Sequence, residues 1–251
     1  MTAAAPTAAA PRVAVVIPAF DEEQAIGSVL AEIPRELVHE VVVVDNGSTD
    51  RTAEVARAHG ARVVAEPRRG YGSACLAGIA ATADADILVF LDGDHSDHAD
   101  DLRSLLPPVV RGEADLVIGS RMQSPDARRA LLPQSRFGNW LATRCLRLLF
   151  GIRCSDLGPF RVVRREALQA LGMRDRDYGW TVEMQLRAHF AGLRVLELPV
   201  RYRARIGRSK ISGTLRGCVL ASWKILTTIG RHRLSPPRVE RYLPGGPAPR
   251  S

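Results

Sequence analysis

The 251-residue sequence contains no run of 18 or more apolar residues, and aromatic residues make up only 5% of it. A helix that spans a bilayer needs roughly 20 mostly apolar residues, so the sequence predicts no membrane span. The first residues, MTAAAPTAAAP, lack the basic start and apolar core of a signal peptide. We therefore expect residues 1–11 to be a disordered tail, and residues 234–251, which are rich in proline and glycine, to be another.

Cysteine and lysine are also scarce. The four cysteines fit no zinc-binding spacing, and without a signal peptide we expect them to be reduced thiols in a cytoplasmic protein. There are two lysines against 33 arginines, although the formal net charge is +8. Such a charge suggests a phosphate-rich or anionic partner. Because the arginine excess can reflect genomic base composition, the position of each basic residue is more informative than their number.

Short β-branched runs alternate with helical stretches over the first 120 residues. This alternation is typical of βαβ units in which helices cover both faces of a parallel sheet. We expect strands at Arg12–Ile17, Glu40–Asp45, Ala61–Ala65, Asp86–Leu91 and Asp115–Gly119. We expect helices at Asp21–Ile33, Thr49–His59 and Tyr71–Ala83.

Residues 157–200 are expected to complete the same sheet, with a helix at Tyr178–Gly192 and a strand at Leu193–Val200. The predicted fold class is therefore α/β, a Rossmann-like open and mostly parallel sheet in a single domain. We place this domain at residues 12–233 and divide it into two halves at 12–120 and 121–233.

Polar or glycine-containing loops follow the first three predicted strands, at residues 18–22, 45–50 and 66–72. Ligands of open α/β sheets bind beyond the carboxyl ends of the strands. At the end of the fourth strand, in LVFLDGDHSD, stand Asp92 and Asp94. Hard divalent cations take carboxylate oxygens and can bridge them to phosphates. An acidic pair alone is weak evidence because many such pairs are solvated turns, but three converging loops strengthen the prediction of a metal and diphosphate site.

Six segments of the chain resemble family 2 glycosyltransferases of the GT-A fold, and among them the polyprenyl-phosphate sugar synthases such as dolichyl-phosphate mannose and glucose synthases. In order along about residues 12 to 213, they are VVIPAFDEE, VVVVDNGSTDRT, PRRGYGSACLAG, LVFLDGDHSD, LVIGSR and RIGRSK. The resemblance implies a GT-A fold, a nucleoside diphosphate sugar such as UDP-glucose or GDP-mannose as donor, and Mg²⁺ or Mn²⁺ as cofactor. It also implies that residues 12–120 form the nucleotide-sugar half and residues 121–233 the acceptor half.

The resemblance also implies roles for individual residues. Asp92 and Asp94 would bind the metal on the diphosphate. The base and ribose would be held by Pro18, Ala19, Glu22 and Asp45. Within the matching segments, further donor-binding residues would be Arg69, Gly70, Gly93 and Arg205. Three positions depart from the family: Asp21 where asparagine is frequent, Asn46 where a second aspartate is common, and Ser96 where some synthases have a glutamine that helps to bind the metal.

Two basic groups are candidates for binding the acceptor. Residues 201–216 contain six basic residues and no acidic one, including Lys210, whose compact ammonium suits phosphate. The alternative is an ordinary solvated strand and loop. The second group includes Arg121 and Arg136 and flanks residues 121–134, which lack a clear period and read as a long loop. In the resembled synthases a corresponding region receives the acceptor phosphate, which makes Arg121 and Arg136 the candidates.

Phosphate and hydroxyl acceptors require different chemistry. A phosphomonoester has its second pKa at about 6, so at neutral pH it can attack the anomeric carbon without a general base. A hydroxyl needs a carboxylate base, for which Glu183 and Asp156 are the candidates, although Glu183 can equally be an ordinary helix residue. We predict metal-dependent hexose transfer to a polyprenyl phosphate with inversion. A soluble sugar or glycerol-type hydroxyl acceptor, or a non-catalytic nucleotide-sugar binder, remains the alternative.

Two stretches could contact a membrane surface. Residues 215–229 are flanked by basic residues and predict a helix with one broad apolar face, formed by Leu215, Val219, Leu220, Trp223, Leu226 and Ile229. A basic amphipathic helix with tryptophan can lie on an anionic membrane, although such stripes more often pack on the protein. Residues 137–152, with Arg144 and Arg147, are the second stretch. The expected location is cytoplasmic, with peripheral contact at the inner face of the cell membrane as an option.

Two other classes of protein fit less well. A nucleotidyltransferase normally has a glycine-rich phosphate loop with arginine and lysine after its first strand, whereas here that loop is PAFDEE. A nucleic-acid binder would interleave aromatic and basic residues, and the few aromatics here are not placed among the arginines. We therefore expect no nucleic-acid partner.

Overall fold

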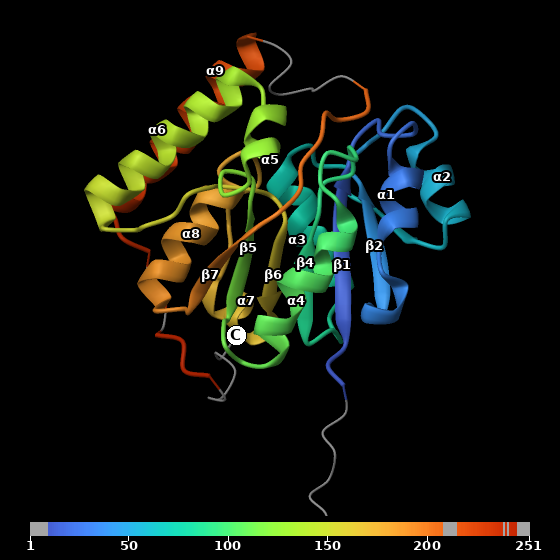
Figure 1. Ribbon diagram of the computed structural model, residues 1–251, viewed down its shortest axis with the longest axis horizontal. Coiled ribbons are helices and arrows are strands. Elements are labelled where there is room, and N and C mark those ends of the chain that lie inside the picture. Colours follow the sequence, from blue (N-terminus) through green and yellow to red (C-terminus); the bar gives the residue numbers. More distant parts are fainter. Residues whose placement is uncertain (1–9, 208–214, 238, 240, 245–251) are drawn as a thin grey trace, which may run out of the picture.

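The computed structural model of the chain is an open sheet with helices on both sides (Figure 1). It describes residues 10–207, 215–237, 239 and 241–244, and for residues 215–222 it describes the backbone alone. Within these residues, seven strands form one sheet in the order β3-β2-β1-β4-β6-β5-β7. The strands are β1 Val13–Ala19, β2 Glu40–Asp45, β3 Arg62–Ala65, β4 Ile87–Phe90, β5 Leu116–Ser120, β6 Arg161–Arg164 and β7 Val195–Pro199.

The described helices lie on the two faces of this sheet and at one side of it (Figure 1). The α-helices are α1 Ile26–Glu32, α2 Thr52–Ala58, α3 Tyr71–Ala81, α4 Leu102–Val110, α5 Pro125–Ala130, α6 Pro133–Phe150, α7 Arg165–Leu171, α8 Trp180–Ala191 and α9 Leu215–Leu234. Two short 3₁₀ turns occupy Arg35–Leu37 and Ala99–Asp101.

The sheet is buried on both faces because its central strands are almost entirely apolar. Along β1, Val15 and Ile17 join a cluster with residues of α1, α2 and α4, whereas Val16 joins a cluster with residues of α3, α7 and α8. Successive side chains of a strand point to opposite faces, so a continuous apolar run suits a strand covered on both sides. The predicted α/β class and open sheet are confirmed.

The directions of the strands determine where the loops that follow them lie. β1 is parallel to β2 and β4, and the register aligns Ala19 with Asp45 at the carboxyl ends of β1 and β2. β6 is antiparallel to both β4 and β5, and β5 is parallel to β7. The loops after β1, β2, β3 and β4 therefore lie at the same edge of the sheet, as the sequence predicted.

Several elements differ from the sequence-based expectation. The prediction did not include β6, which has four residues and begins with the buried Arg161, or α4, which contains Pro107 and Pro108. The reading of residues 121–134 as a long loop was wrong. This stretch contains α5, whose start is capped by Ser124 Oγ accepting a hydrogen bond from Ala127 N at 3.4 Å, and the first two residues of α6.

The C-terminal helix packs on the protein along part of its length. α9 contacts α6 and α8, and Ile229 is buried in a small cluster with Leu146 and Leu186. Trp223, in contrast, is 69% exposed. The prediction that Trp223 and Ile229 share one apolar face was therefore wrong. Three other predicted members of that face, Leu215, Val219 and Leu220, have side chains that the structure does not describe.

The two predicted tails are only partly described. Residues 1–9 lie outside the described part of the chain. In the segment 234–251, Val239 and Tyr242 pack against the second core cluster, and Tyr242 N donates a hydrogen bond to Ala191 O at 2.9 Å. This part of the predicted tail therefore lies against the domain. Among the described residues, no helix has both the length and the hydrophobicity required to cross a bilayer.

Candidate active site

A cavity of about 390 Å³ lies beyond the carboxyl ends of β1, β2 and β4. This size is within the range of small-ligand sites. Nine of the residues predicted to bind the donor line it: Pro18, Ala19, Glu22, Arg69, Gly70, Asp92, Gly93, Asp94 and Arg205. Asp45, which was also predicted, is not part of the lining, and its carboxylate instead accepts a hydrogen bond from Ser48 N at 2.9 Å. The sheet thus brings most of the predicted set into one site.

Asn46 is a lining residue that the sequence prediction had noted only as a departure from the family. Its Nδ2 donates hydrogen bonds to Glu66 O at 2.9 Å and Arg68 O at 2.8 Å, and its Oδ1 accepts one from Gly70 N at 2.8 Å. A carboxylate cannot donate, so aspartate could not make this set of contacts. The amide at position 46 therefore holds the loop after β3 against the end of β2.

Aromatic residues form part of the wall and were not predicted. They are Phe20, Tyr71 and Tyr178, from three separate segments. The guanidinium carbon of Arg69 lies 3.4 Å from the centre of the Phe20 ring, the geometry of a cation–π contact. Phe20 and Tyr71 lie in loops that the sequence had marked, but no local pattern indicates that Tyr178 reaches this cavity.

Arg205 links the basic stretch after β7 to the acidic loops. Its Nη2 is 2.9 Å from Glu22 Oε1 and its Nη1 is 3.1 Å from Asp94 Oδ2. The backbone follows the same path, because Ile206 N donates to Asp94 O at 3.0 Å. The expected convergence of this segment with the donor site is therefore present in the structure at Arg205.

Asp92 is a carboxylate whose surroundings oppose its charge. Burial and the neighbouring Asp94 raise the pKa of Asp92 to about 7, while a hydrogen bond with Tyr71 acts in the opposite direction. Its Oδ1 is buried and has no hydrogen-bond partner among the described residues. An unpartnered carboxylate oxygen in a cavity needs a compensating group, and a cation supplies one.

The oxygen donors of Asp92 and Asp94 suit a hard divalent cation. Asp94 Oδ1 accepts a hydrogen bond from Ser96 N at 2.9 Å, which fixes the orientation of its carboxylate. Among the described residues there is no cluster of three or more acidic, histidine or cysteine side chains arranged to hold a metal. The pair therefore fits a cation that takes its remaining ligands from a bound diphosphate and water, as hard cations in phosphate sites commonly do.

Behind this pair lies Asp97, a buried residue that the sequence prediction missed. Neither of its carboxylate oxygens has a partner among the described residues. Burial, with a further contribution from Asp92, raises the pKa of Asp97 well above its ordinary value of 3.8, although Arg121 opposes the shift. An isolated β-bridge between residues 97 and 202 joins two distant segments of the chain, and it helps to place Asp97 next to the acidic pair.

The raised pKa of Asp97 predicts a pH-dependent effect on stability. The folded protein holds the Asp97 proton more tightly than the unfolded chain, so the contribution of this group falls as pH rises from 3.8 through the folded pKa. Asp97→Asn should therefore be more stable than the wild type by about 1–3 kcal/mol at pH 7.5 and close to equal at pH 4. Urea unfolding at the two pH values measures this, and a difference independent of pH would refute it.

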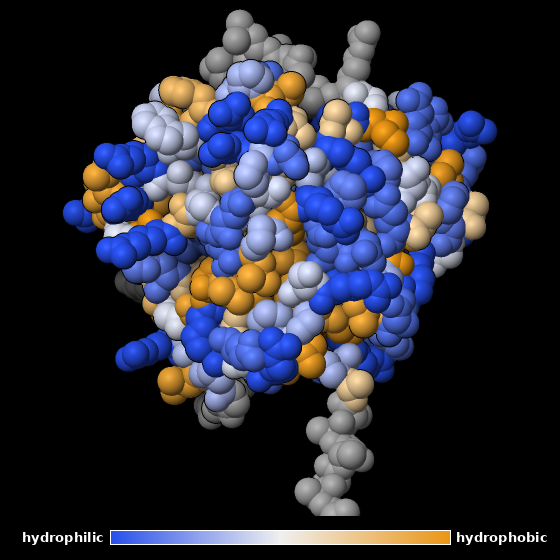
Figure 2. Space-filling view, in the orientation of Figure 1, coloured by the Kyte–Doolittle hydropathy of each residue, from blue (hydrophilic) through white to orange (hydrophobic). Residues whose placement is uncertain are grey.

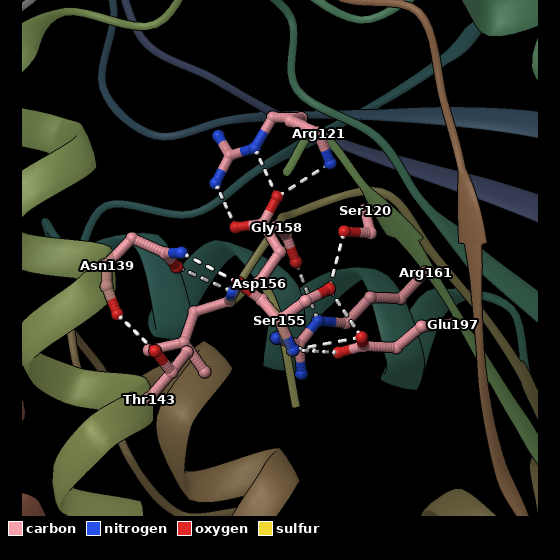
Figure 3. Close-up of polar contacts among 10 residues, drawn as sticks. Ser120, Arg121, Asn139, Thr143, Ser155, Asp156, Gly158, Arg161 and Glu197 are labelled. Carbon is pink, nitrogen blue, oxygen red and sulfur yellow. Dashed lines mark hydrogen bonds and ion pairs between the residues drawn. The ribbon is translucent and has the colours of Figure 1, made fainter. Parts of the chain in front are cut away.

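Arg121, an acceptor-phosphate candidate, is held by Asp156 (Figure 3). Arg121 N and Nε both donate to Asp156 Oδ2 at 2.8 Å, and Nη2 donates to Oδ1 at 2.8 Å. Asp156 is fully buried, and although burial alone would lower the pKa of Arg121, this partner raises it. Arg121 does not line the donor cavity.

The segment that carries Asp156 is itself fixed by polar contacts (Figure 3). Asn139 of α6 donates to Ser155 O at 3.0 Å and accepts from Leu157 N at 2.9 Å. Ser155 Oγ donates to Glu197 Oε2 at 2.6 Å. These bonds tie α6 and β7 to the loop before β6, so the position of Asp156 is set from both sides.

Glu183, the other candidate base, is also engaged. Its Oε2 accepts hydrogen bonds from Arg174 N at 3.0 Å and Asp175 N at 2.7 Å, and its Oε1 accepts one from Arg187 Nε at 2.8 Å. It is 3% exposed and is not part of the donor cavity lining. The arrangement favours a role in holding the loop before α8. Of the remaining candidates, Arg136 is exposed on α6, and Lys210 lies outside the described residues.

The comparison with protein families decides the class. The model for Glycosyl transferase family 2 matches residues 14–172, which is more than half of the chain. The chain belongs to this family. It is therefore a glycosyltransferase, and the cavity, with its two aspartates, lies within the matched region except for Tyr178 and Arg205.

Individual relatives agree with this assignment. The chain is 44% identical over 219 residues to an uncharacterized glycosyltransferase of Mycobacterium tuberculosis strain H37Rv, covering 86% of this chain and 98% of the relative. It is 35% identical over 210 residues to the dolichyl-phosphate hexose transferase of Haloferax volcanii, covering 82% of this chain and 90% of that one.

Among solved structures, glucosyl-3-phosphoglycerate synthase from M. tuberculosis is similar to this glycosyltransferase. The complex of that enzyme with Mn²⁺, UDP-glucose and phosphoglyceric acid matches with a TM-score of 0.72 and 27% identity, covering 92% of this chain and 82% of the other. The predicted GT-A fold is confirmed.

Proposed function

We propose that this glycosyltransferase moves a hexose, glucose or mannose, from a nucleoside diphosphate sugar to a polyprenyl phosphate. The observation that carries the choice of acceptor is that both candidate bases, Glu183 and Asp156, are buried and engaged with arginine side chains and backbone N–H groups. A hydroxyl acceptor needs a free carboxylate near the reacting carbon, whereas a phosphate dianion does not. The geometry therefore favours an acceptor that is already deprotonated.

The donor would occupy the cavity beyond β1, β2 and β4. Asp92 and Asp94 would hold Mg²⁺ or Mn²⁺, which supplies positive charge to the diphosphate. The walls at Pro18, Ala19 and Glu22 would hold the base and ribose, with Asp45 behind them. Arg69, Gly70, Gly93 and Arg205 would complete the donor contacts. The presence of Mn²⁺ and UDP-glucose in the similar synthase supports this arrangement.

The reaction would then be a single displacement with inversion. An oxygen of the acceptor phosphate forms a bond to the anomeric carbon, and the bond from that carbon to the donor diphosphate breaks, so the nucleoside diphosphate leaves with the electron pair. No proton needs to be removed from the acceptor. The residues must bring two anions together and stabilise the negative charge on the leaving group, which is electrostatic work.

On the acceptor side, Arg121, Arg136 and Lys210 are proposed to attract the phosphate. Arg121 would do so with its charge partly neutralised by Asp156, so its main contribution would be oriented N–H groups rather than net charge. The likeness to a dolichyl-phosphate hexose transferase supports a lipid acceptor. The likeness to a synthase whose structure contains phosphoglyceric acid supports a soluble acceptor as the second candidate.

A lipid acceptor requires access to a membrane surface, and α6 offers one. Phe137, Trp140 and Leu148 are exposed on this helix, with the two aromatic rings 5.8 Å apart. Figure 2 shows hydrophobic residues set among hydrophilic ones over α6, at the upper left. Together with Arg144 and Arg147 on the same helix, this pattern suits peripheral contact with an anionic cytoplasmic leaflet.

Calorimetric titration tests the donor assignment. We expect UDP-glucose or GDP-mannose to bind at least about tenfold more tightly with Mn²⁺ than without it, because a metal held by Asp92 and Asp94 would supply positive charge to the diphosphate. Absence of binding to either donor, with or without Mn²⁺, would contradict the proposal. With the donor known, transfer of radiolabelled hexose to polyprenyl phosphate, compared with transfer to phosphoglyceric acid, decides between the two acceptors.

A further inference from the structure

A second and larger cavity, of about 760 Å³, adjoins the loop before α8. Residues from the loop before α3, the loop before α8, α8, α9 and the segment 235–237 that follows α9 form its wall. Six of these residues are cationic: Arg68, Arg174, Arg176, Arg187, Lys224 and Arg231. None of them lines the donor cavity. This cavity is therefore a separate site with a strongly basic wall.

The acidic residues of the wall are already paired. Glu183 is bound by Arg187 Nε at 2.8 Å. Asp175 Oδ2 lies 3.3 Å from Lys224 Nζ, and its Oδ1 accepts hydrogen bonds from Asp177 N and Gly179 N. No other carboxylate contributes to the described lining. Two of the six cations are thus neutralised inside the wall.

Four guanidinium groups remain around the cavity. Within the described part of the chain, the side chains of Arg68, Arg174, Arg176 and Arg231 make no ion pair and no hydrogen bond. On a convex surface such arginines are simply solvated. Around one concave space their charges repel one another and focus a positive potential, and their planar N–H groups match the geometry of phosphate oxygens.

We propose that this cavity binds an anionic phosphate group at a site separate from the donor and acceptor phosphates. The ligand is either a soluble diphosphate or phosphomonoester, or the phosphate headgroup of an anionic lipid. The second source is relevant because Lys224 and Arg231 stand on α9, where the exposed Trp223 precedes Lys224. Both sources present the same chemistry to the four guanidinium groups.

The position of the cavity also links it to the donor site. Ser73 N and Oγ, at the start of α3, donate to Arg176 O at 2.9 and 3.2 Å. A Cβ atom at Gly72 would lie 2.1 Å from Asp175 O, so the backbones of the two segments touch. The same two segments carry Tyr71 and Tyr178 into the donor cavity. An anion held by Arg174 and Arg176 therefore fixes one wall of the donor site.

Pyrophosphate binding, measured by calorimetry on the full chain in EDTA, tests the proposal without the donor-site metal. The test variant is Arg174→Gln with Arg231→Gln, two exposed residues of the wall. The control is Arg57→Gln with Arg233→Gln, exposed arginines outside the wall that remove the same charge. We expect the test variant to bind about tenfold more weakly or worse, and the control to stay within about twofold of the wild type.

Two further measurements decide the location and the source of the ligand. If Arg205→Gln weakens pyrophosphate binding as much as the test variant does, the anion occupies the donor cavity and the proposal is overturned. Sedimentation with phosphatidylglycerol vesicles, compared with phosphatidylcholine vesicles, tests the lipid source. Vesicle binding that needs Arg174 and Arg231 supports a headgroup site even if pyrophosphate does not bind, whereas equal loss in test and control variants, or binding to neither probe, refutes the site.

The same variants keep this proposal distinct from the proposed function. Mn²⁺-dependent donor binding by the test variant, together with an unchanged thermal unfolding midpoint, shows that the donor site is formed whether or not the anion binds. Because an anion fixes a wall of that site, glycerol 3-phosphate, a phosphomonoester that does not mimic the donor diphosphate, should tighten Mn²⁺-dependent donor binding by the wild type about twofold or more and leave the test variant unchanged. Equal tightening in both proteins would refute the link.

Discussion

The variant Asp94→Asn should lose the Mn²⁺-dependent part of donor binding and about 100-fold or more of its turnover. Asparagine keeps the size of the side chain and can still accept the hydrogen bond from Ser96 N, so the loop keeps its shape. What it removes is the negative charge that a divalent cation requires next to Asp92. The third carboxylate of the cavity lining, Glu22, is paired with Arg205, so Asp92 alone would offer the metal too little negative charge.

A matched control separates this effect from a general change in charge. Asp84→Asn removes a carboxylate that is 56% exposed, in the loop that precedes the amino end of β4, whereas Asp94 follows the carboxyl end of that strand. It should bind Mn²⁺ and donor as the wild type does. Both variants are compared by calorimetry and by thermal unfolding. Metal-dependent donor affinity that survives in a folded Asp94→Asn protein would remove the metal from this site.

The donor side of the site could be predicted from the sequence because its signals are local. Pro18 and Ala19 end a continuous apolar strand, and Asp92 and Asp94 follow another, so knowledge of a parallel sheet is enough to bring them together. Arg205 was placed there by resemblance to a family, not by its own pattern. It is 183 residues distant from Glu22, the side chain it contacts.

The acceptor side could not be predicted in the same way because its contacts depend on packing between distant segments. The sequence offered Glu183 and Asp156 as free carboxylates. In the folded chain, the N–H groups of a loop occupy one of them and an arginine 35 residues away occupies the other. The role of Asn46 could not be predicted for the same reason. Its side chain makes hydrogen bonds with three backbone groups that only the fold brings within reach.

Asp156→Asn should destabilise the folded protein by about 3–5 kcal/mol. The substitution leaves the guanidinium of Arg121, whose side chain is only 15% exposed, without its charged partner. Removing one member of a buried ion pair costs more than the pair itself contributes, because the remaining charge stays away from water without compensation. The arginine cannot escape this cost by losing its proton, because a guanidinium group keeps its charge in proteins.

The exposed pair of Asp126 and Arg129 provides the comparison for this stability effect. Arg129 Nη1 lies 3.2 Å from Asp126 Oδ1, but the side chains of Asp126 and Arg129 are 91% and 79% exposed. Asp126→Asn should therefore lower the free energy of unfolding by no more than about 1 kcal/mol. Urea unfolding of both variants measures the difference. The double variant Arg121→Gln with Asp156→Asn should recover part of the lost stability, because neither charge is then buried alone. A cost for Asp156→Asn as small as that for Asp126→Asn would mean that water reaches the pair, and Asp156 would again be a candidate general base.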